Sequence, residues 1–187
     1  LRGTPTCYYG DELGMGDVPI PSDKVQDPWE LNVPGLGLGR DPERTPMQWG
    51  STQYAGFSTA EPWLPLAADY KEINVDGETR DPTSILSFFR GMLTLRSSTP
   101  ALAVGSYRSV YVTVEDVMAY ERAHIGDTIV VVLNFGPDGQ TLDMSEVGTH
   151  GEILLSTFCD RAGVEWMESL SLRGNEGIVL RLKKAGE

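Results

Sequence analysis

The residues best suited to chemistry lie in one short run, residues 40–49, which reads Arg-Asp-Pro-Glu-Arg-Thr-Pro-Met-Gln-Trp. Arg40 and Arg44 each carry a planar guanidinium whose N–H donors match a carboxylate or a pair of neighbouring hydroxyls. Each proline fixes its own φ and holds the residue before it, Asp41 or Thr45, in an extended or turn conformation. Such a stiff loop loses little entropy on binding, so the run predicts a polar binding loop.

Charge and composition argue against several classes of partner. The 187 residues include 27 acidic and 15 basic ones, and the net charge of −12 opposes binding to nucleic acid or to an anionic membrane. Cys7 and Cys159 lie far apart, and His124 and His150 join no cluster with metal-ligand spacing. The sequence therefore predicts no structural metal and a reducing, cytoplasmic compartment.

Neither a membrane segment nor a cofactor motif is expected. No apolar run approaches the ~20 residues of a membrane span, and no basic-then-apolar leader opens the chain. Because the chain begins with Leu1 and not with Met, we expect it to be cut from a longer protein. Gly35, Gly37 and Gly39 alternate with leucines, but a dinucleotide-binding loop needs a strand before it and a helix after it, which the flanking prolines disfavour.

The elements that position the binding loop change along the chain. Residues 2–15 contain a β-branched and aromatic run that stops at Gly10, which predicts a buried strand that ends in a loop. From residue 16 to residue 66 there is no sustained period, yet the tryptophans and phenylalanine of this stretch argue for order. A long ordered loop of this kind is normally functional.

A helix and then an all-β region follow. Asp81 as N-cap, Pro82 as first helical residue and apolar residues at three- and four-residue spacing predict a helix that stops at Pro100. After Ala103, β-rich runs separated by Gly, Asp, Asn and Pro predict an antiparallel β-sandwich. The expected strands are residues 107–114, 117–123, 128–135, 152–155 and 177–182. We therefore predict one domain at residues 1–103 and a second at residues 104–187.

These residues resemble the bacterial α-glucosidases of the α-amylase superfamily, glycoside hydrolase family thirteen. The matching motifs are residues 3–5, 8–15, 40–49, 55–58, 63–66, 69–71, 74–75 and 93–102. The resemblance implies a (β/α)₈ TIM barrel followed by an all-β domain. Because a barrel takes about 250 residues, we expect a C-terminal fragment that holds only the eighth strand, its long loop and the last helix.

The resemblance also implies a retaining mechanism with two carboxylates. In the family the nucleophilic Asp, the acid/base Glu and a transition-state-stabilising Asp follow earlier strands, so we expect no catalytic residue in this chain. Asp11 and Glu12 are adjacent and would point to opposite sides of an extended backbone, whereas the catalytic pair must lie about 5–5.5 Å apart. We interpret them as acceptors that fix their loop.

Arg44 and Arg40 are the candidate substrate-binding residues. The family implies that Arg44, with an upstream Asp, holds the hydroxyls of the terminal sugar; the alternative is a scaffold ion pair with Asp41 or Glu43. Arg40 is the second candidate, with loop scaffolding as its alternative.

Large aromatic residues are the remaining candidates. Trp49 and Trp63 are expected in a core, and Trp29 is left open between packing and stacking on a sugar. Residues 15–38 look like the family's variable entrance loop, which either shapes the subsite for the leaving sugar or is a plain surface excursion.

The leading hypothesis is an inactive fragment of an α-glucosidase that binds oligosaccharide through its parent barrel. A second is a transglycosylase or isomerase of the same superfamily, such as a sucrose isomerase or trehalose synthase. A third is a non-catalytic relative, either a transporter-associated protein or a carbohydrate-binding sandwich. Because the fragment lacks its barrel neighbours, we also expect exposed apolar surface and self-association.

Overall fold

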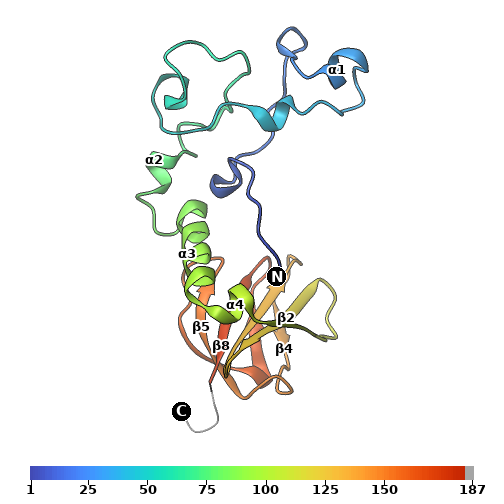
Figure 1. Cartoon of the computed structure of the whole chain (residues 1–187), viewed down its shortest axis with the longest axis vertical. Coiled ribbons are helices and arrows are strands. Elements are labelled where there is room, and N and C mark those ends of the chain that lie inside the picture. Colours follow the sequence, from blue (N-terminus) through green and yellow to red (C-terminus); the bar gives the residue numbers. More distant parts are fainter. Residues whose placement is uncertain (184–187) are drawn as a thin grey trace. The chain divides into compact units, whose positions relative to one another are not determined.

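The computed structural model describes residues 1–183, and the chain divides into two compact units (Figure 1). The β unit comprises Leu1–Pro5 and the residues from Arg90 onward, and the loop unit comprises Thr6–Phe89. Helix α3, Ile85–Ser98, contains the point at which the loop unit ends and the β unit resumes. This division by packing is not the predicted domain boundary at residue 103, which stays a prediction.

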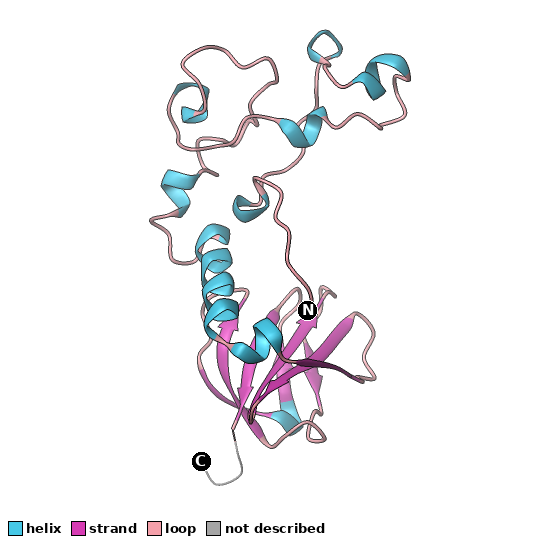
Figure 2. Cartoon of the chain, in the orientation of Figure 1, coloured by secondary structure: helices cyan, strands magenta, loops and turns pink. Residues whose placement is uncertain are grey.

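The β unit is built on antiparallel strands, as predicted (Figure 2). Six strands form one sheet in the order β1-β2-β3-β8-β5-β6, and β4 pairs with β7 in a second, smaller sheet. The bounds are β1 Ser106–Val110, β2 Val117–His124, β3 Asp127–Asn134, β4 Gln140–Leu142, β5 His150–Ser156, β6 Gly163–Trp166, β7 Leu170–Leu172 and β8 Gly177–Leu182.

Strand β3 is buried on both faces, which explains its uninterrupted apolar run. Val130 and Val132 join the cluster between the two sheets, whereas Ile129 and Val131 pack on the other side with Leu102 of helix α4, Pro100–Val104. Successive side chains of a strand point to opposite faces, so a strand covered on both sides needs apolar residues at every position. The six-stranded sheet is therefore covered by the small sheet on one face and by α4 on the other.

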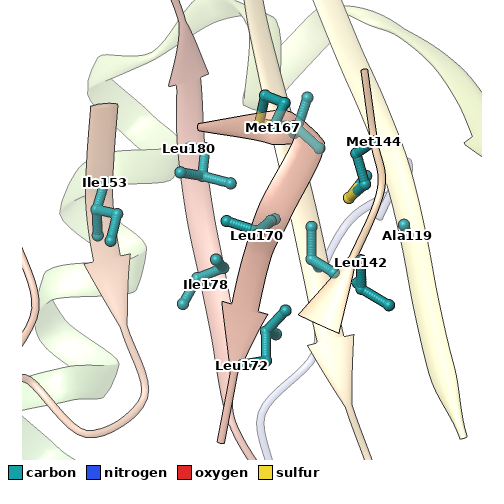
Figure 3. Packing of buried hydrophobic residues seen from close by; sticks show 11 residues of the cluster. Ala119, Leu142, Met144, Ile153, Met167, Leu170, Leu172, Ile178 and Leu180 are labelled. Carbon is teal, nitrogen blue, oxygen red and sulfur yellow. The ribbon is translucent and has the colours of Figure 1, made fainter. Parts of the chain in front are cut away.

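The main apolar core of the β unit lies between its two sheets. Figure 3 shows Leu142, Leu170 and Leu172 of the small sheet packed beside Ile178 and Leu180 of β8. The buried members of this cluster are Ala119, Val130, Val132, Leu142, Met144, Ile153, Met167, Leu170, Leu172, Ile178 and Leu180. Removing apolar area from water is the main stabilising contribution to such a sandwich.

The five predicted strands are all present: β8 has the predicted bounds, and the ends of the other four are shifted. β1 stops at Val110, four residues before its predicted end at residue 114. Three further strands, β4, β6 and β7, have no counterpart among the predictions. They are three or four residues long, too short for an alternating pattern to stand out from the flanking loops.

The expectation of a buried strand near the start of the chain is wrong. Residues 1–9 are exposed and adopt no strand. The carbonyls of Leu1 and Gly3 instead accept hydrogen bonds from arginine side chains, at 3.0 Å from Arg122 Nη1 and 2.6 Å from Arg96 Nη2 respectively. A strand needs a neighbour that takes its backbone hydrogen bonds, and no strand of residues 1–183 pairs with this segment.

The loop unit contains only short helical segments. Helix α1 is Pro28–Asn32 and helix α2 is Val75–Glu78, and single 3₁₀ turns lie at Asp11–Leu13, Ser22–Lys24, Asp41–Arg44 and Gln53–Gly56. Its buried apolar cluster is small and consists of Leu13, Met47 and Leu86. Hydrogen bonds between loops must therefore supply much of its order.

Helix α3 begins later than predicted. Asp81 is not its N-cap, because its Oδ1 accepts bonds from the backbone N–H and hydroxyl of Thr83 and closes a separate turn. Ser84 takes the capping role: its Oγ accepts from the N–H of Ser87 at 3.1 Å. Of the predicted apolar stripe, Leu86 is buried, whereas Ile85 is 51% exposed. Exposed apolar surface was expected and is present.

The hairpin between β2 and β3 generates a stability prediction. It turns through Ile125 and Gly126 at φ values of 41° and 78°, and Ile125 is 91% exposed. A β-branched residue is strained at positive φ, whereas asparagine tolerates it. We expect Ile125→Asn to raise the free energy of unfolding by about 1 kcal/mol, measured by urea titration. Ile125→Val keeps the branch and serves as control; an equal gain in both variants would contradict the explanation.

Candidate functional site

The predicted binding loop folds as a single 3₁₀ turn followed by an extended segment. The turn is Asp41–Arg44, with Pro42 in its first positions, and Thr45 is extended at φ −64° and ψ 159° before Pro46. Both prolines thus act as their φ preferences predict. The result is a fixed loop that places Arg40 at the start of the turn and Arg44 at its end.

A buried carboxylate, Asp27, holds both arginines. Its side chain is fully buried, and its Oδ2 accepts from Arg40 Nε at 2.8 Å and from the backbone N–H of Arg40 at 3.3 Å. Arg44 Nη1 lies 3.5 Å from the same oxygen. The hydrogen bond from Arg40, with the backbone N–H of Trp29, lowers the pKa of Asp27. Asp27 is therefore ionised at neutral pH.

The alternative interpretation of Arg44, a scaffold ion pair with Asp41 or Glu43, names the wrong partner, because Arg44 pairs with Asp27. Asp41 instead accepts from the backbone N–H groups of Gln26 and Asp27, at 2.6 Å and 2.8 Å. Asp41 thus fixes the backbone at Asp27. Asp27 in turn holds the side chains of Arg40 and Arg44, which belong to the same turn as Asp41. Two loop segments are joined in this way by charged hydrogen bonds, which are stronger than neutral ones.

Arg44 lines a hollow of about 630 Å³ in the loop unit, called here the aromatic hollow. Its other lining residues are Tyr9, Glu12, Thr45, Pro46, Met47, Trp49, Phe57, Glu61, Pro62, Trp63 and Leu64. Its volume falls within the about 300–1,000 Å³ of small-molecule sites. The Arg44 side chain is 41% exposed, so donors not used by Asp27 face solvent.

Trp49 and Trp63 are not core residues, contrary to expectation. They are 51% and 77% exposed and line the aromatic hollow together with Phe57. The loop unit has a core of only a few residues, so it cannot enclose three large rings. Trp29, left open by the sequence, is 55% exposed and is not among the residues that line the hollow.

Tyr9 lines the aromatic hollow and contacts the binding loop. Its hydroxyl donates to the carbonyl of Thr45 at 3.0 Å, and burial raises its pKa, so it remains a donor at neutral pH. Tyr9 also lines a smaller hollow of about 210 Å³, together with Tyr8, Asp11 and Glu43 among others. The contact ties the segment before Gly10 to the binding loop.

Asp11 and Glu12 serve as backbone acceptors, as interpreted from the sequence. Asp11 Oδ2 accepts from the N–H of Tyr8 at 3.0 Å, and Glu12 Oε2 accepts from the N–H of Gly10 at 2.8 Å. Both carboxylates are thus engaged in shaping their turn. Glu12 also lines the aromatic hollow, where its charge lies among apolar rings.

The structure joins Arg40 and Arg44 through Asp27 but brings only Arg44 to the aromatic hollow. Sequence reasoning missed Asp27. The pair Asp27-Pro28 is a helix-start signal, and Asp27 does cap α1 by accepting from the N–H of Trp29 at 2.8 Å. That signal predicts the helix cap but not the contacts with Arg40 and Arg44, which lie 13 and 17 residues further along the chain.

Residues 1–183 contain neither a metal-type cluster of side chains nor a membrane-spanning helix. No group of three or more His, Cys, Asp or Glu side chains in this part of the chain is arranged to hold a metal ion. Within the same residues, no helix has the length and apolar character needed to cross a bilayer.

The chain is similar to several known proteins. A family model described as the α-amylase catalytic domain matches residues 1–105. An oligo-1,6-glucosidase of Halalkalibacterium halodurans is 38% identical over 152 residues, which cover 72% of this chain and 27% of that protein. Trehalose synthase/amylase TreS of Mycobacterium tuberculosis is 37% identical over 155 residues, covering 77% and 23%.

Solved structures also match this chain, over nearly its whole length. The crystal structure of trehalulose synthase MutB from Pseudomonas mesoacidophila MX-45 superposes with a TM-score of 0.83 at 32% identity and covers 97% of this chain. Only 36% of that protein is matched. The chain therefore spans about a quarter to a third of the length of these relatives.

Removal of the Asp27 charge should loosen the binding loop. In Asp27→Asn the amide cannot pair with two guanidinium groups, so we expect the N–H groups of Trp29 and Arg40 to exchange with solvent roughly tenfold faster. The measurement is amide hydrogen exchange by NMR on the 187-residue chain. Asp23→Asn, which makes the same change at an exposed acid, serves as control.

The same contact predicts a pH dependence with a definite sign. Because the folded-state pKa of Asp27 is lowered, the contact is intact above the ordinary aspartate pKa of about 3.9 and is lost as the pH falls through the lower folded-state value. Protection of these amides should therefore persist at pH 4. Loss of protection above pH 5 would contradict the assignment.

Proposed function

The chain belongs to the α-amylase family, and on that premise we propose that it is the C-terminal part of an α-glucosidase. The proposed reaction is hydrolysis of terminal α-linked glucose from short oligosaccharides. The family match to residues 1–105 and the similarity to an oligo-1,6-glucosidase support the reaction class. The aromatic hollow supplies the chemistry that a sugar would require.

The observation that carries the proposal is the placement of Arg44. Arg44 lines the hollow together with Trp49, Phe57 and Trp63. Its Nη1 is paired with Asp27 Oδ2 at 3.5 Å. A planar donor fork suits two neighbouring hydroxyls of a pyranose, and aromatic faces suit its C–H face. Arg44 is thus proposed to hold the terminal sugar, whereas Arg40, outside the lining, is proposed to act through the loop.

The proposed mechanism is retaining and uses two carboxylates that lie upstream of this chain. Those carboxyls must flank the scissile bond about 5–5.5 Å apart. Asp11 and Glu12 are proposed to take neither role, because each already accepts a backbone hydrogen bond within its own turn. The contribution of this chain is to orient the sugar and to exclude water from one side of it.

The remaining assignments follow from the same proposal. Residues 1–103 would complete a TIM barrel and residues 104–187 would form the domain after it; the end of the family match at residue 105 supports this boundary. We further propose a cytoplasmic location, supported by two free cysteines, and no nucleic-acid or membrane partner. Exposed apolar residues such as Ile85 and Leu93 support self-association of the chain alone.

A second candidate function is isomerisation or transglycosylation. The similarity to proteins named trehalose synthase/amylase and trehalulose synthase favours it specifically. Product analysis of the longer protein separates the two reactions. Free glucose from maltose supports hydrolysis, whereas a rearranged disaccharide with little free glucose supports isomerisation.

The 187-residue chain alone should be inactive. We expect no release of p-nitrophenol from p-nitrophenyl α-glucoside above the buffer rate, because the proposed catalytic carboxylates are not in it. The longer protein measured at the same molar concentration provides the positive control. Turnover by the short chain would overturn the division of labour proposed here.

Removal of the Arg44 guanidinium should slow the longer enzyme. Loss of a charged donor to substrate hydroxyls predicts a fall in kcat/KM of about 100-fold for Arg44→Ala. Arg44→Lys keeps the charge but loses the planar pair of donors, so its kcat/KM should lie between those of the unsubstituted enzyme and Arg44→Ala. Arg80→Ala is the matched control. Arg80 Nε donates to the carbonyl of Asp76, and Arg80 is not among the residues that line the aromatic hollow. Equal kcat/KM for Arg44→Ala and Arg80→Ala would contradict the role of Arg44.

A further inference from the structure

Strand β2 carries an arginine whose charge is buried in the β unit without a counter-ion. Arg122 is 0% exposed. Its guanidinium nitrogens donate to three backbone carbonyls, those of Leu1, Gly105 and Ser106, each at 3.0 Å. Among residues 1–183, no carboxylate pairs with it. A buried charge is costly unless an opposite charge compensates it. The carbonyls satisfy the donors of Arg122 but leave its positive charge in place.

A second arginine lies beside Arg122 on the same backbone segment. Arg96 of helix α3 donates from Nη1 to the carbonyls of Leu1 and Leu102, at 3.3 Å and 3.0 Å. Its Nη2 donates to the carbonyl of Gly3 at 2.6 Å. Because the Leu1 carbonyl accepts from both arginines, the two guanidinium groups are neighbours. No carboxylate within the described residues pairs with Arg96 either.

Arg2 adds a third positive charge to this part of the β unit. It is exposed, and its side chain makes no hydrogen bond or ion pair among residues 1–183. Burial lowers the pKa of Arg122, and the charges of Arg96 and Arg2 lower it further, as expected for neighbouring cations. Arg2, Arg96 and Arg122 are called here the arginine cluster.

The arginine cluster is unusual in a chain whose net charge is −12. Other arginines of the described chain find a carboxylate partner. Those that do so are Arg40, Arg44, Arg108, Arg161, Arg173 and Arg181. The cluster therefore concentrates positive charge that the described chain does not neutralise.

Arg96 also keeps two N–H donors that are not used within the described residues. Its Nε has no acceptor there, and its Nη2, which carries two N–H groups, donates to one carbonyl. Nε and Nη2 form one edge of the planar guanidinium, which can present two parallel N–H groups. The residue is partly exposed, so a small ligand can reach this edge from solvent.

These features select the chemical class of a ligand. A cation would be repelled, and a neutral molecule would leave the excess charge in place. A monatomic anion offers no pair of oxygens for two parallel donors. An oxyanion matches the planar edge with two oxygens and compensates the charge of the neighbouring guanidinium groups. A large polyanion would be repelled by the acidic remainder of the chain.

We propose that the arginine cluster is a binding site for a small oxyanion of the phosphate class, held by the free edge of Arg96 and by Arg2. The buried Arg122 does not touch the ligand and contributes its charge. The site lies within the β unit and is independent of the proposed glycosidase reaction. Bound oxyanion would reduce the repulsion among the cations that hold the carbonyls of Leu1 and Gly3, so it would stabilise that contact.

The test is an NMR titration of the 187-residue chain with inorganic phosphate at pH 7. Sodium chloride keeps the ionic strength constant, so that general screening does not change. We expect saturable shifts of the Arg96 Nε–H signal and of the backbone amides of residues 2–4. The thermal midpoint should rise with phosphate and not with sodium chloride at the same ionic strength.

Variants of the two exposed donors locate the binding. Arg96→Gln should raise the Kd at least about tenfold, since a charged hydrogen-bond donor is lost. Arg96→Lys keeps the charge but loses the two-donor edge, so its Kd should lie between those of the parent chain and Arg96→Gln. Arg2→Gln should raise the Kd about threefold. Arg80→Gln, a change at an arginine of the loop unit, is the control and should leave the Kd unchanged.

Two controls keep the outcome decisive. Thermal midpoints without phosphate show whether each variant is folded, and Arg2→Gln removes a side chain without contacts among residues 1–183, so it decides the matter if the Arg96 variants unfold. The Leu1 ammonium donates to the Tyr120 hydroxyl at 2.9 Å, and a chain acetylated at this amine should still bind phosphate. The proposal is overturned by the absence of saturable shifts, by an unchanged Kd in folded Arg96→Gln or in Arg2→Gln, or by loss of binding on acetylation alone.

Discussion

The order of the loop unit depends on the buried charge of Asp27. The Asp27 side chain is fully buried and accepts hydrogen bonds from the backbone N–H groups of Trp29 and Arg40. A buried ion is costly unless it is paired and hydrogen-bonded, so its arginines must stay in place. This requirement fixes the direction of Arg44, and the aromatic hollow acquires a donor at a defined position.

The two units are stabilised in different ways. The β unit contains a continuous apolar core on both faces of β3, so burial of apolar area dominates its stability. The loop unit has a small core, and its long segments are held by side-chain acceptors such as Asp27 and Asp41. A loop stabilised by polar contacts leaves its aromatic rings free to face a ligand, as Trp49 and Trp63 do.

The sequence predicted those features that depend on local pattern. The β-rich runs of β2, β3 and β8, separated by Gly, Asp, Asn and Pro, identified their strands, because a buried strand needs apolar residues whatever its neighbours are. The residues of the binding loop identified Arg44 as a site candidate. The burial of Asp27, the exposure of Trp63 and the three short strands were missed, since each depends on which distant residues come together.

We propose that Arg44 holds substrate and that Asp27 positions it. A double-mutant cycle separates these roles: kcat/KM on maltose is measured for the longer protein with Asp27→Asn, with Arg44→Ala and with both substitutions. We expect Asp27→Asn to lower kcat/KM in the presence of Arg44 and to have little further effect once Arg44 is absent. Independent, multiplicative losses from the two substitutions would contradict it.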